Sequence, residues 1–138
     1  LEVTMKLLFK KIRPFIIPVV ITLAVVILFH SIFFLGYVPT ESMEPTLETG
    51  SLILGLRCYD DLQNSDIIIF RHDGSYLVKR IAASAGETVV HQNKLVIVPE
   101  DSFFVLGDNA DNSLDSRHWE NPFVSLDDVM AKLLLPIE

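Results

Sequence analysis

A serine lies in a proline-flanked segment that begins where a long apolar run ends. The segment runs from Pro39 to Leu47, and it holds a second proline, Pro45. Each proline fixes its own φ, lacks an N–H and biases the residue before it toward extended geometry, which keeps the segment out of helix. We therefore expect Ser42 on a loop or irregular strand, where its hydroxyl is a candidate nucleophile.

A lysine on a predicted strand is the second candidate. In residues 76–81 a strand period of two places Leu77, Lys79 and Ile81 on one face. Aliphatic neighbours favour desolvation of the ammonium group, and burial lowers a lysine pKa by up to about 3 to 5 units. A lysine whose pKa falls to about 7 to 8 can act as a general base near neutral pH. The alternative is an edge-strand lysine that opposes aggregation.

A loop rich in Asp and Asn covers residues 107–119. Such loops usually form turns held by hydrogen bonds between side chains and backbone. A calcium loop starting at Asp111 would put Ser116 where glycine is needed and Pro122 where a bidentate glutamate is needed. Calcium is therefore not expected.

The histidines and the cysteine leave one alternative open. A Ser–His–Asp triad would use Ser42 with His72, His91 or His118, although nothing in the sequence selects one of them and no Gly-x-Ser-x-Gly turn is present. These histidines lack metal-ligand spacing, and the single cysteine, Cys58, can form neither an intrachain disulfide nor a cysteine-based metal site. We expect no metal and no cofactor.

An apolar run at the N-terminal end must hold these candidates at a membrane. Residues 15–38 contain no Asp, Glu, Lys or Arg, and the mean hydropathy of the 138-residue chain is +0.41. As a helix the run is about 36 Å long, enough to cross a hydrocarbon core of about 30 Å. The competing interpretation, a cleaved signal peptide, needs an apolar region of only about 7 to 15 residues. We expect an uncleaved transmembrane helix over 15–38, with the basic residues 1–14 in the cytoplasm and 39–138 outside.

The exported part is strongly acidic. It holds seven basic and seventeen acidic residues, a formal charge of −10. Nucleic acid is excluded as a partner, because phosphate binding needs clustered Lys and Arg. Contact with the lipid bilayer should accordingly be hydrophobic.

The exported part also has the pattern of a β protein. Short runs rich in β-branched and aromatic residues, separated by turn residues, predict a small antiparallel β-barrel or sandwich. The predicted strands cover residues 51–56, 66–71, 76–81, 87–91, 94–98 and 102–106. Residues 127–138 alternate like a strand, which we favour, although Ser125 with Asp128 could cap a helix.

In chain order these stretches resemble type I signal peptidases, membrane-bound Ser/Lys endopeptidases that remove signal peptides from exported preproteins. The resemblance covers nearly the whole chain, through the anchor helix and residues 42–47, 65–71, 78–81 and 107–117. It implies Ser42 as the nucleophile and Lys79 as the general base. It also implies a bacterial plasma membrane protein with one span, whose partners are the signal peptides of preproteins and the bilayer.

Further roles are implied by the same resemblance. The hydroxyl of Thr40 and the N–H of Ser42 would stabilise the oxyanion, and Ser113 would orient the lysine amine. Ion-pair or loop-holding roles fall to Arg80, Asp108, Asp115 and Arg117. An extended substrate with small side chains one and three residues before the cut would contact Val38, Pro39, Met43, Leu47, Leu77 and Val78. Ordinary core packing is the alternative for Leu47 and Val78.

Two departures from the family pattern are visible. Residues 82–87 stand where the family commonly has Gly-x-Pro-Gly-Asp, and Ala110 replaces a common arginine. The chain also lacks the large inserted β region of longer members. Neither departure removes a proposed catalytic group. The alternative function is a catalytically idle relative that binds preproteins or assists the assembly of surface structures.

Overall fold

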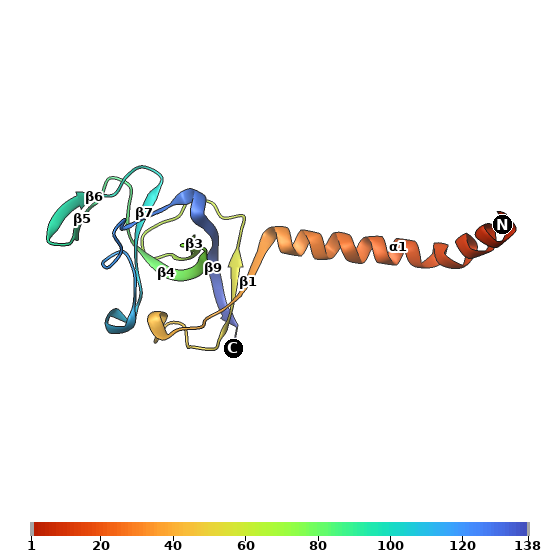
Figure 1. Cartoon of the computed structure of the whole chain (residues 1–138), viewed down its shortest axis with the longest axis horizontal. Coiled ribbons are helices and arrows are strands. Elements are labelled where there is room, and N and C mark those ends of the chain that lie inside the picture. Colours follow the sequence, from red (N-terminus) through yellow and green to blue (C-terminus); the bar gives the residue numbers. More distant parts are fainter. Residues whose placement is uncertain (1, 138) are drawn as a thin grey trace. The chain divides into compact units, whose positions relative to one another are not determined.

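A computed structural model describes residues 2–137, with the surroundings of side chains described for residues 12–134. The chain divides into two compact units, with the boundary between Ile32 and Phe33. The first unit is a helix and the second holds all the strands (Figure 1). Every residue that the sequence singled out for chemistry belongs to the second unit.

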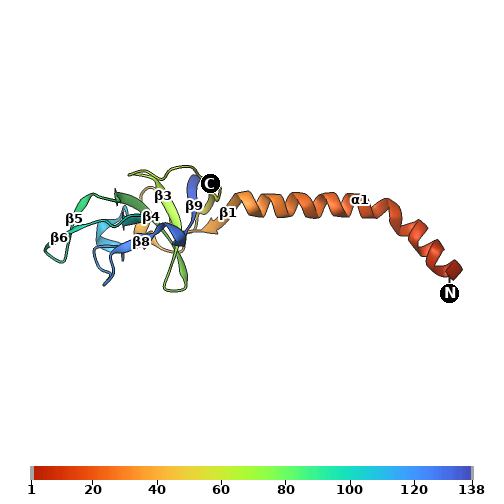
Figure 2. The ribbon, with the colours of Figure 1, turned by 90° about the horizontal axis from the view of Figure 1, so that it is seen from above.

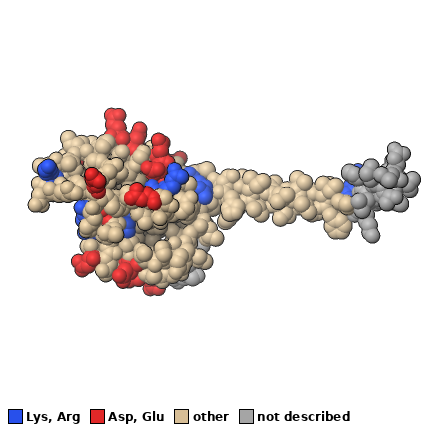
Figure 3. Space-filling model, viewed as in Figure 1, with Lys and Arg blue, Asp and Glu red and all other residues tan. Residues whose placement is uncertain are grey.

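Helix α1 spans Glu2–Ile32. Its segment Ile12–Ile32 is long and apolar enough to cross a membrane, with a mean hydropathy of 2.7. The hydroxyls of Thr22 and Ser31 donate to the carbonyls four residues earlier, so both groups are satisfied inside the helix. Figure 3 shows a largely uncharged helix surface, and acidic side chains spread over the visible face of the β domain. These properties fit a membrane anchor.

The helix ends earlier than the sequence predicted. We expected it to continue to Val38, but it ends at Ile32, and the next residues form strand β1, Phe33–Tyr37. Strand β1 pairs antiparallel with β2, Leu52–Leu56, with Phe33 opposite Leu56 and Tyr37 opposite Leu52. An apolar run has the same composition in a helix and in a buried strand, so only the pairing partner separates the two.

The β domain is built on one antiparallel sheet of seven strands, in the order β1-β2-β9-β3-β4-β7-β8, and a separate hairpin, β5-β6. Figure 2 shows this hairpin projecting from the other strands. The further strands are β3 Ile67–His72, β4 Ser75–Ser84, β5 Thr88–His91, β6 Lys94–Ile97, β7 Ser102–Leu106, β8 Phe123–Ser125 and β9 Val129–Ile137. The mainly β, antiparallel fold is confirmed. Within residues 2–137 the outer strands β1 and β8 do not pair, so the sheet is not a closed barrel.

The C-terminal segment combines both expectations for it. The hydroxyl of Ser125 accepts from the N–H of Asp127 and caps one turn of 3₁₀ helix, η3, Leu126–Asp128. Strand β9 follows directly and lies between β2 and β3. The cap signal is therefore real, but long-range pairing limits the helix to one turn.

Strand β3 is the centre of the core, because four consecutive residues, Ile67 to Phe70, are buried. Alternate side chains enter two clusters on opposite faces of the sheet. Ile67 and Ile69 pack with Val38, Met43, Leu47, Ile53 and Ala131. Ile68 and Phe70 pack with Ile81, Phe103, Val105, Val124 and Val129. The first cluster anchors the segment that carries Ser42.

Candidate active site

Ser42 lies in a single turn of 3₁₀ helix, η1, Glu41–Met43. The N–H of Glu44 closes the turn by donating to the carbonyl of Glu41 at 3.0 Å. We expected a loop or irregular strand, but one turn fits between Pro39 and Pro45, where no proline ring or missing N–H opposes it. Met43 is 1% exposed and fixes the turn to the core.

Lys79 extends from β4 to the turn that carries Ser42. Its side chain is 3% exposed, and its Nζ donates to the Oγ of Ser42 at 2.6 Å. Burial is the main cause that lowers the pKa of Lys79 below its ordinary value, and the charge of Arg117 acts in the same direction. The carboxylates of Asp115 and Asp108 oppose this shift. A lysine in this setting loses its proton more readily than a lysine in water.

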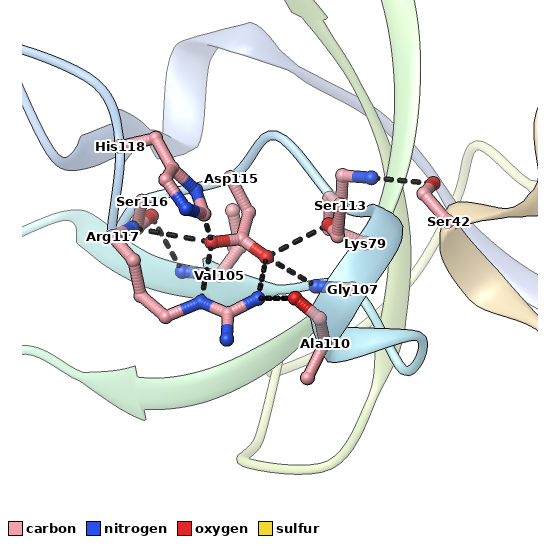
Figure 4. Close-up of polar contacts among 10 residues, drawn as sticks. All are labelled: Ser42, Lys79, Val105, Gly107, Ala110, Ser113, Asp115, Ser116, Arg117 and His118. Atoms are coloured by element: carbon pink, nitrogen blue, oxygen red, sulfur yellow. Dashed lines mark hydrogen bonds and ion pairs between the residues drawn. The ribbon is translucent and has the colours of Figure 1, made fainter.

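The loop after β7 contains a fully buried carboxylate, Asp115 (Figure 4). Its Oδ2 accepts from the hydroxyl of Ser113 at 2.7 Å, from the N–H of Gly107 at 2.9 Å and from Arg117 at 2.8 Å. Burial alone would raise the pKa of Asp115, but these hydrogen bonds outweigh it and lower the pKa to about 2. The charged carboxylate therefore joins Ser113 and Arg117 to Gly107, the residue that directly follows β7.

A second ion pair joins β4 to the same loop. Arg80 donates to both oxygens of Asp108, with distances of 2.8 Å from Nε and 2.6 Å from the terminal nitrogen. Such a paired contact fixes orientation as well as distance. Because Arg80 is the residue after Lys79, the pair also fixes the part of β4 that carries the amine.

Gly107 permits the close approach of these segments. A Cβ at this position would lie 2.1 Å from the Oγ of Ser113 and 2.5 Å from the carbonyl oxygen of Ser42. Both distances are far below a van der Waals contact, so only glycine fits without displacing a neighbour. The loop after β7 therefore packs directly on the backbone of Ser42.

A groove of about 430 Å³ opens beside Ser42 and Lys79. One wall is β1 with the residues that follow it, and the other wall is β4. Phe34 and Tyr76 meet across the groove in an edge-to-face contact, with ring centroids 5.5 Å apart. The lining is Phe34, Leu35, Gly36, Tyr37, Val38, Pro39, Thr40, Ser42, Met43, Ile53, Ile69, Tyr76, Leu77, Val78 and Lys79. Apart from Ser42, Thr40, Lys79 and the backbone, these walls are apolar or aromatic.

The structure brings most of the candidate residues together. Val38, Pro39, Met43, Leu77 and Val78 line the groove, whereas Leu47 does not and is 1% exposed in the core. Leu47 packs against Ile69 and its neighbours in the core, so a substrate side chain cannot contact it directly.

The two residues proposed to assist Ser42 and Lys79 also lie at the site. The hydroxyl of Thr40 donates to the Oγ of Ser42 at 3.4 Å. Ser113 and the backbone of Ser42 both lie beside Gly107. The hydroxyl of Ser113 donates a hydrogen bond to Asp115. The action of Ser113 on the lysine amine stays a prediction.

At Ala110 the backbone carbonyl accepts from Arg117 at 3.3 Å, a contact that does not depend on the side chain at this position.

The three histidines of the β domain lie elsewhere. His72 stacks on Trp119 at 4.0 Å, and His118 faces Asp115 on the side away from Lys79 and Ser42 in Figure 4. His91 is buried at the end of β5, where both ring nitrogens lack a partner. None of them bonds to Ser42 within the described residues.

Three contributors were missed by reasoning from the sequence: Gly107, Asn109 and the aromatic pair of Phe34 with Tyr76. Gly107 and Asn109 belong to the stretch that carries the resemblance, but that stretch assigned no contact to either residue. The aromatic residues belong to strands that are not neighbours in the sheet, so no spacing relates them.

Comparison with known proteins connects this geometry to a family. The profile described as signal peptidase, peptidase S26, matches residues 11–98 and 90–137 of the chain. The chain belongs to this family. The match includes the helix, the turn with Ser42, β4 with Lys79 and the loop with Asp115, and membership supports signal-peptide cleavage as the general activity.

Individual relatives carry the same family name. A Bacillus amyloliquefaciens protein named signal peptidase I is 27% identical over 137 residues, which cover 72% of this chain and 74% of that protein. A Leptolyngbya laminosa protein of the same name is 30% identical over 119 residues, covering 60% of this chain and 59% of that protein. A Staphylococcus aureus protein named inactive signal peptidase IA is 23% identical over 145 residues, covering 80% and 83%. The family therefore includes members named as inactive, and activity has to be argued from the residues at the site.

Proposed function

We propose that this protein is a membrane-anchored serine endopeptidase that removes signal peptides from exported preproteins, with Ser42 as nucleophile and Lys79 as general base. The observation that supports it most directly is the 2.6 Å contact between the lysine Nζ and the serine Oγ, in a site where the lysine is 3% exposed. Proton transfer needs this proximity, and the lowered pKa of Lys79 favours the neutral amine that can accept a proton.

The first half of the reaction forms an acyl-enzyme. The neutral amine of Lys79 takes the proton of the Ser42 hydroxyl while Oγ bonds to the scissile carbonyl carbon, whose oxygen becomes an oxyanion. The N–H of Ser42 and the hydroxyl of Thr40 donate to that oxyanion. When the C–N bond breaks, the ammonium of Lys79 returns its proton to the leaving amine, which becomes the new N-terminus.

The second half releases the signal peptide. Water gives a proton to Lys79 and its oxygen bonds to the acyl carbon. The tetrahedral species then collapses, the bond to Oγ breaks, and Lys79 protonates Oγ. The serine and the neutral lysine are thereby restored, and the signal peptide leaves as a carboxylic acid that gives its proton to water.

Substrate enters the apolar groove in extended form. Within residues 2–137, residues 75–79 of β4 pair with β3 on one edge only, because pairing with β7 starts at Arg80. The free edge offers backbone groups to an added strand, while the apolar walls suit small aliphatic side chains of an Ala-x-Ala type. Large side chains are excluded by the limited volume of the groove.

In this proposal the helix anchors the β domain to a membrane. With the basic residues 1–14 in the cytoplasm, the β domain faces the outside of a bacterial plasma membrane. Nine residues, 33–41, lie in the sequence between the end of α1 at Ile32 and Ser42. Signal peptides lie in the same bilayer, so an anchored β domain and its substrates share one membrane.

The decisive experiment compares cleavage of an Ala-x-Ala preprotein by the full chain in lipid vesicles and by its Ser42→Ala and Lys79→Ala variants. We expect turnover by the wild type and loss of at least about 1,000-fold in each variant. His118→Ala, at a residue near Asp115 but not at Ser42, is the matched control and should remain active. Equal processing by all forms would defeat the proposal.

A catalytically idle preprotein-binding protein is the second candidate, favoured by the relative named inactive. It predicts that the wild type binds the preprotein without cleaving it and that Ser42→Ala changes neither result. A Ser/His hydrolase instead predicts that loss of His72, His91 or His118 abolishes turnover while Lys79→Ala does not.

A further inference from the structure

A single residue of the loop after β7 contacts both peptide groups beside Ser42. The backbone N–H of Asn109 donates to the carbonyl of Ser42 at 3.0 Å. The side-chain Nδ2 of Asn109 donates to the carbonyl of Glu41 at 3.1 Å. Asn109 thus holds the carbonyls on both sides of the Ser42 Cα.

The contact with Glu41 has a consequence for the N–H of Ser42. The peptide group between these residues is planar, and in its trans form the carbonyl of Glu41 and the N–H of Ser42 point in opposite directions. Fixing the direction of the carbonyl therefore fixes the direction of the N–H. A hydrogen bond accepted by the carbonyl also polarises the amide and makes its N–H a better donor.

The turn itself supplies only part of this restraint. The N–H of Glu44 also donates to the Glu41 carbonyl, at 3.0 Å, and comes from the same short turn. Asn109 adds a donor from outside the turn. Its own loop is tied down, because Gly107 donates to the buried Asp115 and the N–H of Asn112 donates to the carbonyl of Asn109 at 3.1 Å.

We propose that Asn109 is a positioning residue that aims the N–H of Ser42 at the oxyanion formed during peptide cleavage. The inference rests on the proposed function, because it assumes that Ser42 attacks a carbonyl. Asn109 does not touch the reacting atoms in this arrangement. It acts through the peptide plane that it holds.

The test compares Asn109→Asp with Asn112→Asp in the full chain. Asn109→Asp keeps the backbone N–H and the side-chain size, but it replaces the Nδ2 donor with a carboxylate oxygen that repels the Glu41 carbonyl. Asn112 is exposed in the same loop, so Asn112→Asp introduces the same charge without this contact. We expect kcat to fall about 10- to 100-fold for Asn109→Asp with KM changed less than about threefold, and Asn112→Asp to match the wild type.

A second readout separates aiming from general damage. A peptide aldehyde adds to the serine hydroxyl: Oγ bonds to the aldehyde carbon, the hydroxyl proton passes to Lys79, and the carbonyl oxygen becomes an oxyanion. The matching peptide alcohol binds in the groove but cannot form this adduct. Asn109→Asp should weaken inhibition by the aldehyde by the same factor as kcat and leave binding of the alcohol unchanged.

The outcomes distinguish failure of this inference from failure of the proposed function. A wild-type kcat in Asn109→Asp, or an equal loss of aldehyde and alcohol binding, would overturn the role of Asn109 while leaving the serine peptidase proposal intact. A wild type that cleaves no better than Ser42→Ala would defeat the proposed function, and the aiming role with it.

Discussion

The Nζ of Lys79 and the Oγ of Ser42 lie 2.6 Å apart, although 37 positions separate the two residues in the chain. Lys79 lies on β4 inside the sheet, and Ser42 lies on a turn that Met43 anchors in the core, so both positions are fixed. The amine is buried and the groove runs past both groups. In the proposed mechanism, the protonation state of Lys79 therefore controls the reactivity of Ser42.

Activity should rise with pH through the pKa of Lys79, because only the neutral amine can accept the serine proton. Burial lowers this pKa from the ordinary 10.5, so the acidic limb of kcat/KM should lie below the range of an ordinary lysine. The measurement is kcat/KM for a signal-sequence peptide across the pH range in which the protein stays folded. A profile without an acidic limb would contradict the role of the lysine as a base.

Asp115→Asn should destabilise the fold in a pH-dependent way. The folded-state pKa of Asp115, about 2, lies below its ordinary 3.8, so the carboxylate stabilises the fold above about pH 4 and loses this effect as the pH falls toward 2. The pH-dependent part is on the order of 2 kcal/mol in the free energy of unfolding. Denaturant unfolding at several pH values should show a difference in the free energy of unfolding between wild type and variant. This difference should become smaller in acid.

The matched control for this experiment is Asp111→Asn, which removes the same charge from an exposed position of the same loop. Its unfolding free energy should stay within about 0.5 kcal/mol of the wild type. If the difference in unfolding free energy between wild type and Asp115→Asn is constant from neutral pH to pH 2, the carboxylate charge does not stabilise the loop.

Gly107→Ala should impair both stability and catalysis. The added methyl would overlap Ser113 and the Ser42 carbonyl, so we expect a loss of about 1 to 3 kcal/mol and a fall in kcat/KM of about 100-fold. Gly74→Ala is the comparison, since Gly74 has φ +80 but open space around it. It should cost about 1 to 2 kcal/mol through backbone strain and leave kcat/KM nearly unchanged. Equal activities of the two variants would contradict the packing argument.

Tyr76→Ala should widen the substrate range. Tyr76 lies three residues before Lys79 on β4, a distance of about 10 Å along a strand, which is the length of three extended substrate residues. Its ring contacts Phe34, which also lines the groove, so we expect the pair to limit the side chains that fit there. For peptides that differ three residues before the cut, the kcat/KM ratio of phenylalanine to alanine should rise about 10-fold. Leu95→Ala, at a 76% exposed hairpin residue outside the groove, is the control and should leave the ratio unchanged. An unchanged ratio in Tyr76→Ala would contradict a role of Tyr76 in limiting the substrate side chain.

The order of elements in the β domain could be read from local patterns. The strand positions from Leu52 to Leu106 follow runs of β-branched residues between turns, and each prediction agrees with the structure to within a few residues. The alternation around Lys79 likewise placed it beside aliphatic neighbours, because the side-chain period of a strand depends only on nearby residues. Strands β1 and β8 escaped prediction, since one continues an apolar run and the other is only three residues long.

The partners of the functional groups depend on contacts between distant segments. The spacing of residues in the sequence does not show that Lys79 reaches Ser42 or that Asp115 accepts from Gly107. It also does not show that Asn109 contacts the Glu41 carbonyl. These contacts involve β4, the turn η1 and the loop after β7. Leu47 shows the same limit, since composition suits it equally to a pocket and to the core. Residue types and periods thus identified which groups have chemistry to offer, while the packing of the sheet decided which of them meet.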